Sequence, residues 1–393
     1  MKITYGISVY WPAINGASIY AHRLARAMAE EHEVRVITQS REHDHDWLYS
    51  PTLDSKGSFV YEDGKAKVNL IGVRGFEKML LWPAVNLYYS LNHFSTAVLQ
   101  SVFRRKVFPL VRGADLVHNY LLDLDYFNCL LQNASQSEKI PYIVTPFIHS
   151  SLMEDKLNTR RMALIRNADR VIALTHQEKD WLIREGVTPA KVYVIPGGPV
   201  LSSQYHAETF RKKYHIEGPM VLFIATKRKC KGYQHILEAM GRVWSQHPDT
   251  HFVFLGMRTQ EFENDSRHFQ DKRVIDIGLT DLEEKTSALA ACDLFCMPSV
   301  AESFGIVFTE AWSLHKPVIG GDCPSTREII DHGKDGFIVS QDSNEIAKQI
   351  NLLLSDGSLC EQMGRLGKQK VQNQYSWEKA VEKLKGIYSE LLN

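Results

Sequence analysis

The chain of 393 residues is 44% hydrophobic and 23% charged, as expected for a globular protein with a substantial core, and its length predicts two domains. Basic and acidic residues number 46 each, so the zero net charge does not favour a nucleic-acid partner. The six cysteines form no CxxC pair and no zinc-like spacing, and no apolar run is long enough to cross a membrane. These features predict a cytoplasmic protein, either soluble or attached to the inner face of the cell membrane.

The first two hundred residues alternate strand and helix signals. Short apolar strands are expected at residues 3–10, 34–38, 115–118, 142–145, 170–174 and 192–195, with a helix at 18–31. Between residues 60 and 73 the pattern changes to a hairpin that turns at Glu62-Asp63-Gly64-Lys65. The βαβ alternation predicts a doubly wound, largely parallel sheet.

Residues 76–111 are rich in aromatic and aliphatic side chains and also contain Arg104, Arg105 and Lys106. Such a segment could form core helices of the first domain or an oligomer contact, and we favour these two interpretations. The alternative is a surface helix that reaches an anionic membrane and a lipid-linked acceptor.

Residues 196–199, Pro-Gly-Gly-Pro, predict the boundary between a first domain of residues 1–198 and a second of residues 199–375. Strands are then expected at 221–225, 251–256, 274–277, 294–297, 317–320 and 336–339, and helices at 233–244, 287–291, 305–313, 325–331 and 346–354. Residues 376–393 predict an amphipathic helix that packs back on the first domain. Two consecutive open α/β sheets would place their ligand crevices at the carboxyl ends of the strands, facing each other across a cleft.

Two glutamates, Glu302 and Glu310, follow the apolar strand at 294–297. Pro298 should end that strand, and a helix should open after Ser303, with Ser303 or Glu302 as its cap. At about 1.5 Å per helical residue, the two carboxylates would lie roughly 12 Å apart along the axis. That span suits a ligand with a sugar at one end, a ribose at the other and a diphosphate between them.

The first turn of this expected helix would present free N–H groups at Phe304, Gly305 and Ile306. These groups would face the phosphates, because a helix N-terminus favours negative charge. Any strand–helix junction can carry two acidic residues, so the spacing alone does not establish a site.

The segments together resemble the retaining GT-B glycosyltransferases of family four, the group 1 type. The resemblance is strongest at PSVAESFGIVFTEAWSLHKPVIGGD, DGFIV and YSWEKAVEKL, and it extends to ADRVIALTHQEKDWLIREGV and KVYVIPGG. It implies the GT-B architecture, an α/β fold of two Rossmann-like domains. The implied activity is transfer of a hexose from a GDP- or UDP-sugar to a hydroxyl of a glycan, lipid-linked or small-molecule acceptor, with retention and without a metal or other cofactor.

Carried over residue by residue, the resemblance places Glu310 at the ribose hydroxyls and Glu302 beside the transferred sugar. Lys231 would neutralise the leaving diphosphate, since a fixed cation in a dry cleft does so without reorganisation. Ser303 and the backbone of residues 304–306 would line the donor site.

The resemblance also implies an arginine next to Lys231. We favour Arg228 for this role, with Lys227 as the fallback, although this basic run could instead be a solvated loop. The segment after residue 196 lacks the aspartate that the family often carries, which leaves any contact from that loop open.

In the first domain, Gly16 and Ala17 occupy the place of a glycine pair between the first strand and helix, where backbone amides can approach a phosphate or the acceptor. His149 matches a histidine that in relatives faces the donor sugar. His118 matches a second family histidine, to which we assign a structural role.

Other interpretations remain. A nucleotide-sugar epimerase of the same fold, or a non-catalytic subunit that binds a nucleotide sugar, would share these motifs. A dinucleotide dehydrogenase is disfavoured because no GxGxxG follows the first strand. Asp44-His45-Asp46 and Asp123-Leu124-Asp125 are DxD triplets. In a different glycosyltransferase fold such triplets hold a divalent metal on the diphosphate, but here neither lies where the phosphates are expected.

Overall fold

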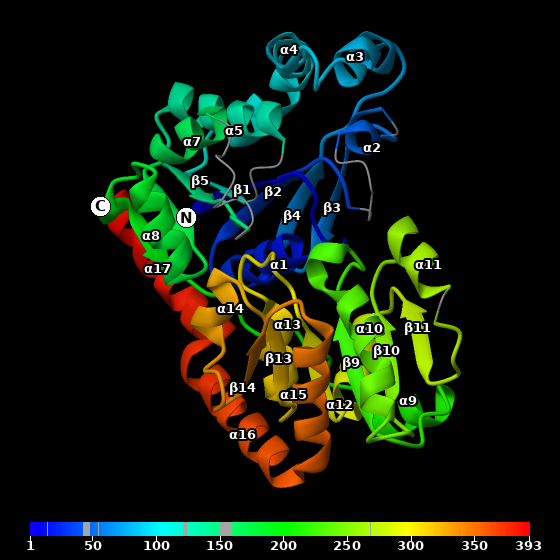
Figure 1. Cartoon of the computed structure of the whole chain (residues 1–393). Coiled ribbons are helices and arrows are strands. Elements are labelled where there is room, and N and C mark those ends of the chain that lie inside the picture. The colour runs from blue at the N-terminus through cyan, green and yellow to red at the C-terminus, as the bar shows by residue number, and fades with distance from the viewer. Residues whose placement is uncertain (14, 42–47, 54, 121–123, 150–158, 268) are drawn as a thin grey trace. The chain divides into compact units, whose positions relative to one another are not determined.

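The computed structural model describes residues 1–13, 15–41, 48–53, 55–120, 124–149, 159–267 and 269–393 (Figure 1). The chain divides into two compact units. The first consists of Met1–Ile148, Asp155–Ile195 and Trp377–Asn393, and the second of His149–Glu154 and Pro196–Ser376. Each unit is built on one sheet, which agrees with the predicted pair of α/β domains.

The sheet of the first unit consists of β1 (Lys2–Ile7), β2 (Glu33–Thr38), β3 (Phe59–Asp63), β4 (Ala66–Leu70), β5 (Leu116–Tyr120), β6 (Tyr142–Thr145), β7 (Arg170–Ala173) and β8 (Val192–Val194). Their order is β3-β4-β2-β1-β5-β6-β7-β8. β3 pairs antiparallel with β4, as the predicted hairpin requires, and the other pairs are parallel. The chain runs from β1 to β2 on one side and later places β5 on the other, so the sheet reverses its order between β1 and β5.

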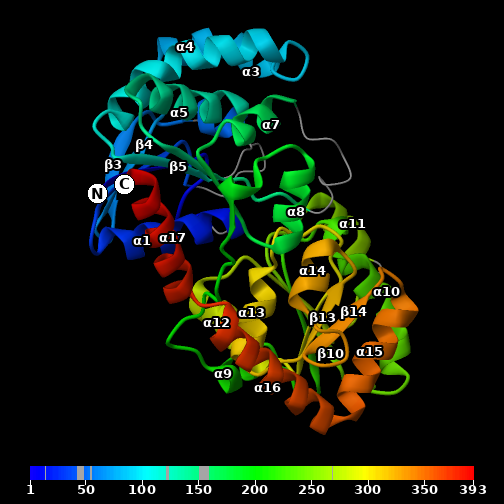
Figure 2. The same ribbon diagram turned by 90° about the vertical axis from the view of Figure 1, so that its left-hand side faces the viewer.

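The helices of the first unit are α1 (Gly16–Ala29), α2 (Tyr49–Thr52), α3 (Phe76–Asn86), α4 (Asn92–Val111), α5 (Asp125–Glu138), α7 (Thr159–Arg166), α8 (His176–Arg184), the short η1 (Pro189–Lys191) and α17 (Trp377–Leu392). α5 packs on the sheet, α4 packs on α5, and α3 packs on α4. Figures 1 and 2 both show α3 and α4 as the helices of this unit farthest from its sheet. Within the described ranges, no helix combines the length and apolar character needed to span a membrane.

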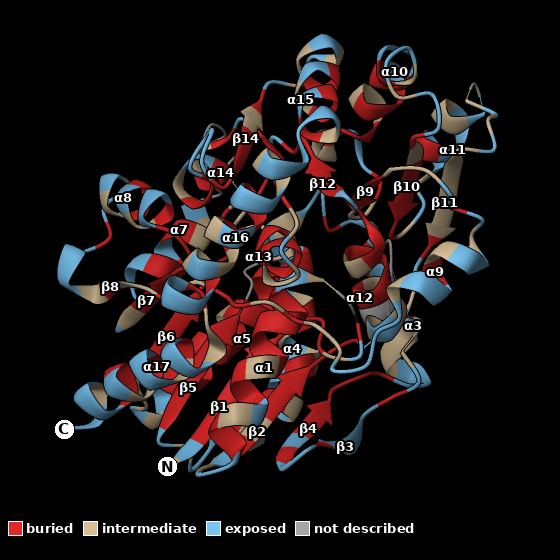
Figure 3. Cartoon of the chain, turned by 90° about the horizontal axis from the view of Figure 1, so that it is seen from below, coloured by how far each residue is buried: buried red, intermediate tan, exposed pale blue. Residues whose placement is uncertain are grey.

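The sheet of the second unit consists of β9 (Met220–Ile224), β10 (His251–Leu255), β11 (Val274–Gly278), β12 (Leu294–Met297), β13 (Val318–Gly321) and β14 (Gly336–Val339). They are parallel in the order β11-β10-β9-β12-β13-β14. β9, β10 and β12 are almost wholly buried (Figure 3), as expected for parallel strands covered on both faces.

The helices of the second unit are α9 (Ala207–Lys213), η2 (Lys229–Lys231), α10 (Tyr233–Trp244), α11 (Gln260–Ser266), α12 (Leu282–Ala291), α13 (Ile306–Ser313), α14 (Pro324–Ile329), α15 (Ser343–Ser355) and α16 (Gly357–Gln374). α10 has the bounds that its apolar spacing predicts, because its buried residues repeat every three or four positions. α12 begins five residues before the predicted helix, where Asp281 caps it by accepting the N–H of Glu284 at 2.8 Å.

The C-terminal helix α17 returns to the first unit, as predicted, and packs against α1. At its surface, Lys385 pairs with Glu31 at 2.7 Å. In the core, the hydroxyl of Tyr388 lies 2.6 Å from Nδ1 of His118, whose Nε2 lies 2.8 Å from the hydroxyl of Thr145. His118 is fully buried, and burial lowers its pKa to about 3, so the imidazole is neutral and joins α17 to β5 and β6 by hydrogen bonds.

Stability should fall in mildly acid solution because of His118. Its pKa is about 3 in the folded protein against a reference value of 6.5, so the unfolded chain takes up a proton first. The contribution is complete above pH 6.5 and is lost as the pH falls from 6.5 towards 3, by up to about 1.4 kcal/mol per pH unit. Urea unfolding at neutral and mildly acid pH measures this loss. His118→Gln should be less stable at neutral pH but flatter with pH, and equal slopes for the two proteins would contradict the assignment.

Candidate functional site

The loops after β9 and β12 leave the sheet of the second unit at adjacent strands. The chain continues from β9 towards β10 on one side, while β12 lies on the other side of β9. In open α/β sheets, ligands bind beyond the carboxyl ends of the strands at such a reversal of order. The predicted residues Lys231 and Glu302 lie in these two loops.

Lys231 and Glu302 form an ion pair with 2.6 Å between Nζ and Oε1. The same ammonium donates to the carbonyl oxygen of Ala301 at 2.7 Å, and the hydroxyl of Ser325 donates to the carbonyl oxygen of Glu302 at 2.7 Å. Both charged side chains are largely buried. The structure therefore brings together two of the predicted residues that lie 71 positions apart.

Glu310 is also buried and paired. Its Oε1 accepts from Nζ of Lys285 at 2.6 Å and from the backbone N–H of Val200 at 3.3 Å. Lys285 lies on α12, two residues before the helix expected at 287–291, and was not singled out in the sequence. The contact from Val200 is made by the backbone, so the loop after residue 196 reaches Glu310 without the aspartate that the family often carries.

The helix that carries Glu310 begins within one residue of the predicted range 305–313, but its cap differs from the prediction. α13 starts at Ile306, and its cap is Gly305 with φ +85° rather than Ser303 or Glu302. Glycine adopts this left-handed conformation without strain, so the chain turns into the helix there. The interval between the two glutamates is therefore only partly helical, and the estimate of 12 Å from the helical rise does not apply. The free N–H groups of the first turn begin at Ile306.

Ser303 and Phe304 form a bend before the helix, and the Phe304 side chain is part of the core. Its ring packs edge-on against Tyr375, with 5.3 Å between centroids. Only the backbone of Phe304 could therefore contribute to a site, as predicted, and Ser303 is partly exposed.

His149 groups with the second unit. Burial lowers the pKa of its imidazole, and the positive charges of Lys231 and Arg228 act in the same direction, while the carboxylate of Glu302 and the backbone of Ala301 oppose them. These influences place His149 beside the Lys231–Glu302 pair as a neutral imidazole. Arg228 is exposed at the start of the loop.

Lys227, the fallback for this arginine, has a structural place instead. Its side chain is fully buried, forms an ion pair with Asp276 and donates to the carbonyl oxygen of Gly256 at 2.8 Å. Its ammonium also lies 5.0 Å from the ring centroid of Phe262. Because its side chain is fully buried among these groups while that of Arg228 is exposed, we assign Lys227 a structural role and keep Arg228 as the predicted partner of Lys231.

Gly16 and Ala17 begin α1 rather than end the preceding loop. Asn15 caps the helix by accepting the N–H of Ser18 at 2.8 Å, which starts it two residues before the predicted position. The free N–H groups of Gly16 and Ala17 thus lie at the amino end of a 14-residue helix, beyond β1, where this sheet reverses its order.

Glu178 is a buried residue of the first unit that the sequence did not reveal. Its carboxylate accepts from the backbone N–H groups of Ile148 at 2.9 Å and Leu174 at 2.7 Å. Its own N–H donates to Thr175, the cap of α8, at 3.1 Å. A Thr-x-x-Glu pattern marks the helix start, but it does not show that the carboxylate fixes the backbone just before His149.

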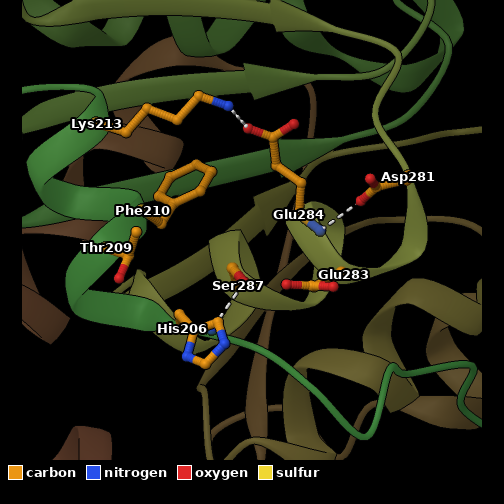
Figure 4. A pocket seen from close by; sticks show the side chains of 8 residues that line it. All are labelled: His206, Thr209, Phe210, Lys213, Asp281, Glu283, Glu284 and Ser287. Atoms are coloured by element: carbon orange, nitrogen blue, oxygen red, sulfur yellow. Dashed lines mark hydrogen bonds and ion pairs between the residues drawn. The ribbon is translucent and has the colours of Figure 1, made fainter.

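A hollow of the second unit lies between α9 and α12 and contains none of the predicted residues (Figure 4). In it, Lys213 pairs with Glu284, and the backbone N–H of His206 donates to Ser287 at 2.9 Å. These contacts join α9 to α12, so we interpret the hollow as structural.

Neither DxD triplet forms a described metal site. Asp44-His45-Asp46 and Asp123 lie outside the described residues, and Asp125 pairs with Arg161 at 2.9 Å. Across the part of the chain that the structure describes, no three His, Cys, Asp or Glu side chains gather as metal ligands.

Solved structures share this fold across nearly the whole chain. Sucrose-phosphate synthase from Thermosynechococcus elongatus superposes with a TM-score of 0.75 at 20% identity, covering 100% of this chain and 99% of that one. Anabaena Alr3699/HepE in complex with UDP and glucose superposes with a TM-score of 0.73 at 17% identity, covering 99% of each chain. The two-sheet architecture is therefore that of the GT-B glycosyltransferases.

Family models identify the chain more closely. The model for glycosyl transferases group 1 matches residues 206–370, and that for glycosyltransferase family 4 matches residues 14–201. The chain belongs to this group of glycosyltransferases, as its motifs predicted. The comparisons give no support to the epimerase alternative.

Curated relatives are distant in sequence. N-acetyl-alpha-D-glucosaminyl L-malate synthase of Bacillus anthracis is 24% identical, with 100% of this chain and 98% of the relative covered. Spore coat protein SA of Bacillus subtilis (strain 168) is 26% identical over 47% of this chain and 52% of the relative. Alpha-D-kanosaminyltransferase of Streptomyces kanamyceticus is 27% identical over 58% and 62%. The matched region thus spans about half to two thirds of the length of the last two relatives.

A substitution at Gly232 can test how tightly the loop that carries Lys231 is packed. It follows Lys231 with φ +79°, and a Cβ there would lie 2.4 Å from the carbonyl oxygen of Pro298. Gly232→Ala should destabilise the protein by about 1–2 kcal/mol from the left-handed backbone alone, displace the loop and lower turnover. Gly241→Ala is the matched control, because it lies in α10 with open space at its Cβ and should stabilise by about 0.5–1 kcal/mol. Chemical unfolding and activity assays separate the two, and equal behaviour would disprove the close packing.

Proposed function

We propose that this glycosyltransferase moves a hexose from a nucleoside diphosphate sugar to a hydroxyl of a glycan, lipid-linked or small-molecule acceptor, with retention of anomeric configuration. The observation that carries the proposal is the Lys231–Glu302 pair beside His149, at the reversal of strand order in the second sheet. A largely buried cation next to a carboxylate is the arrangement needed where a diphosphate leaves and positive charge develops on a sugar.

The donor would extend from Glu302 to Glu310. The Glu310 carboxylate would accept hydrogen bonds from the ribose hydroxyls, and Lys285 would lie at the same end of the ligand. The diphosphate would lie between them, facing Lys231, Arg228 and the free N–H groups at the start of α13. In the first unit, Gly16 and Ala17 at the start of α1 remain the predicted donor-binding residues, as the resemblance implies.

Lys231 would release its hold on the loop when the donor binds. Its ammonium now donates to Ala301 and Glu302 and would turn one of these hydrogen bonds towards a phosphate oxygen. The acceptor oxygen would bond to the anomeric carbon on the face from which the diphosphate departs, and a phosphate oxygen would take the acceptor proton. Because that phosphate oxygen takes the proton, no separate general base is required. Neutral His149 would hydrogen-bond a sugar hydroxyl.

Substitutions at the two ion pairs test the assigned roles. Glu302→Gln and Lys231→Ala should lower kcat by roughly a hundredfold or more, because each removes charge stabilisation made mainly in the transition state. Glu310→Gln should chiefly raise the donor KM. Steady-state assays need the preferred donor, which a panel of UDP- and GDP-sugars can reveal by the largest rise in Tm.

Lys213→Ala is the matched control for these variants, because it breaks a Lys–Glu pair of the same unit, in the hollow between α9 and α12. It should leave kcat unchanged. Near-normal turnover in both Glu302→Gln and Lys231→Ala would refute the assigned chemistry.

Transfer should also survive removal of divalent metal. In this proposal the protein's own cations and amides neutralise the diphosphate, so EDTA should leave the rate of sugar transfer unchanged. An initial-rate assay with and without EDTA checks this, and a loss that manganese restores would show that a metal performs the role given to Lys231 and Arg228.

A further inference from the structure

Helix α3 of the first unit is apolar on two opposite faces. One face consists of Leu81, Ala84 and Val85, which are buried where α3 packs on α4. A helix with one partner normally exposes polar residues on its other side. α3 instead continues apolar around its circumference, so its second face needs a separate explanation.

The second face is strongly exposed. Eight large apolar side chains of α3, the following turn and the start of α4 are exposed: Phe76 (71%), Met79 (66%), Leu80, Trp82 (58%), Leu87, Tyr89 (87%), Leu91 and Phe94. They make up half of the sixteen exposed large hydrophobic residues in the described chain, yet they fall within 19 positions. We call this set the α3 patch. An apolar cluster of this kind marks an interaction site, and the structure thus overturns our preference for a core location of this face.

The stretch of chain that carries the α3 patch is rich in basic residues. Residues 74–112 contain six lysines and arginines and a single acidic residue, in a chain whose net charge is zero. That acidic residue, Glu77, is already neutralised by Lys106 at 2.9 Å. Lys78, Arg104 and Arg105 have no carboxylate within ion-pair distance among the residues that the structure describes. Within the described part of the chain, the two helices that carry the α3 patch therefore bear unpaired positive charge.

We propose that the α3 patch docks on the surface of a membrane that contains anionic lipids. Tryptophan and tyrosine, here Trp82 and Tyr89, suit the boundary between headgroups and acyl chains because their rings are apolar with a polar edge. The aliphatic residues of α3 enter the acyl boundary, and the neighbouring cations lie at the level of the lipid phosphates. The contact is peripheral, and it does not depend on the proposed sugar transfer.

Charge decides against a second copy of this chain as the partner. In a two-fold dimer the same patch faces itself, so Lys78, Arg104 and Arg105 of both copies would be brought together. Such like charges repel, whereas anionic headgroups neutralise them at about 1 kcal/mol per cation, which corresponds to about a fivefold gain in affinity for each. Lys78, Arg104 and Arg105 therefore favour an anionic lipid surface over a second copy of this chain as the partner.

The test is co-sedimentation of the full chain with phosphatidylcholine vesicles, with and without phosphatidylglycerol. We expect binding to the anionic vesicles, weakened by salt, and little binding to phosphatidylcholine alone. Met79→Glu and Trp82→Glu should each weaken binding at least tenfold, because they place a charge in the apolar contact. Arg104→Gln combined with Arg105→Gln should weaken it roughly tenfold or more and reduce the salt dependence.

Leu352→Glu is the matched control, since it also replaces an exposed apolar side chain of a helix, here α15 of the second unit. It should bind vesicles as the wild type does, and thermal unfolding of each variant verifies the fold. Failure of the wild type to bind anionic vesicles would overturn the proposal. So would equal binding by Met79→Glu and Leu352→Glu, or a concentration-dependent dimer that Met79→Glu abolishes without any vesicle binding. None of these measurements uses the sugar donor. Their failure would therefore not count against the proposed function, which its own assays test separately.

Discussion

The ion pair between Lys231 and Glu302 is the interaction on which the proposed site depends. It joins the loops that follow the two central strands of the second sheet, β9 and β12. Burying two charges costs several kcal/mol each, and a pair offsets that cost only when its remaining hydrogen bonds are made. Here Ala301 accepts a second bond from the lysine, and Ser325 holds the backbone of Glu302. Each loop is therefore held in place by the other.

The proposed donor would need more positive charge than the two ion pairs of the site supply. Lys231 with Glu302, and Lys285 with Glu310, are each neutral overall, whereas a diphosphate brings additional negative charge. In the proposed site the surplus would come from Arg228 and from the amides at the start of α13, whose dipole is positive at that end. This requirement gives the left-handed turn at Gly305 a physical role, because a side-chain cap would occupy the N–H groups that an anion needs.

Much of the fold could be predicted from the sequence, because parallel strands and amphipathic helices leave periodic patterns. α10 was placed correctly since its apolar residues repeat at helical spacing between a glycine and a polar end. Backbone conformation was harder to predict. Side-chain capping predicted Ser303 or Glu302 as the cap of α13, whereas the left-handed turn at Gly305 provides it. Contacts between distant segments were not accessible. Lys285 belongs to no motif and lies outside the helix predicted at 287–291, and only the structure shows it beside Glu310.

The same limit explains the interpretation of residues 76–111. The sequence of a helix that is apolar on both sides is typical of a core helix. It does not show that one of these sides is exposed among the residues that the structure describes. Net charge was also misleading, since it sums over the whole chain. Screening confines the influence of an exposed charge to about 8 Å at physiological ionic strength, so acidic residues elsewhere do not cancel Lys78, Arg104 and Arg105 at the α3 patch. An approaching anionic surface is attracted by the charges within this screening distance. One face of the first unit can therefore be basic although the net charge of the chain is zero.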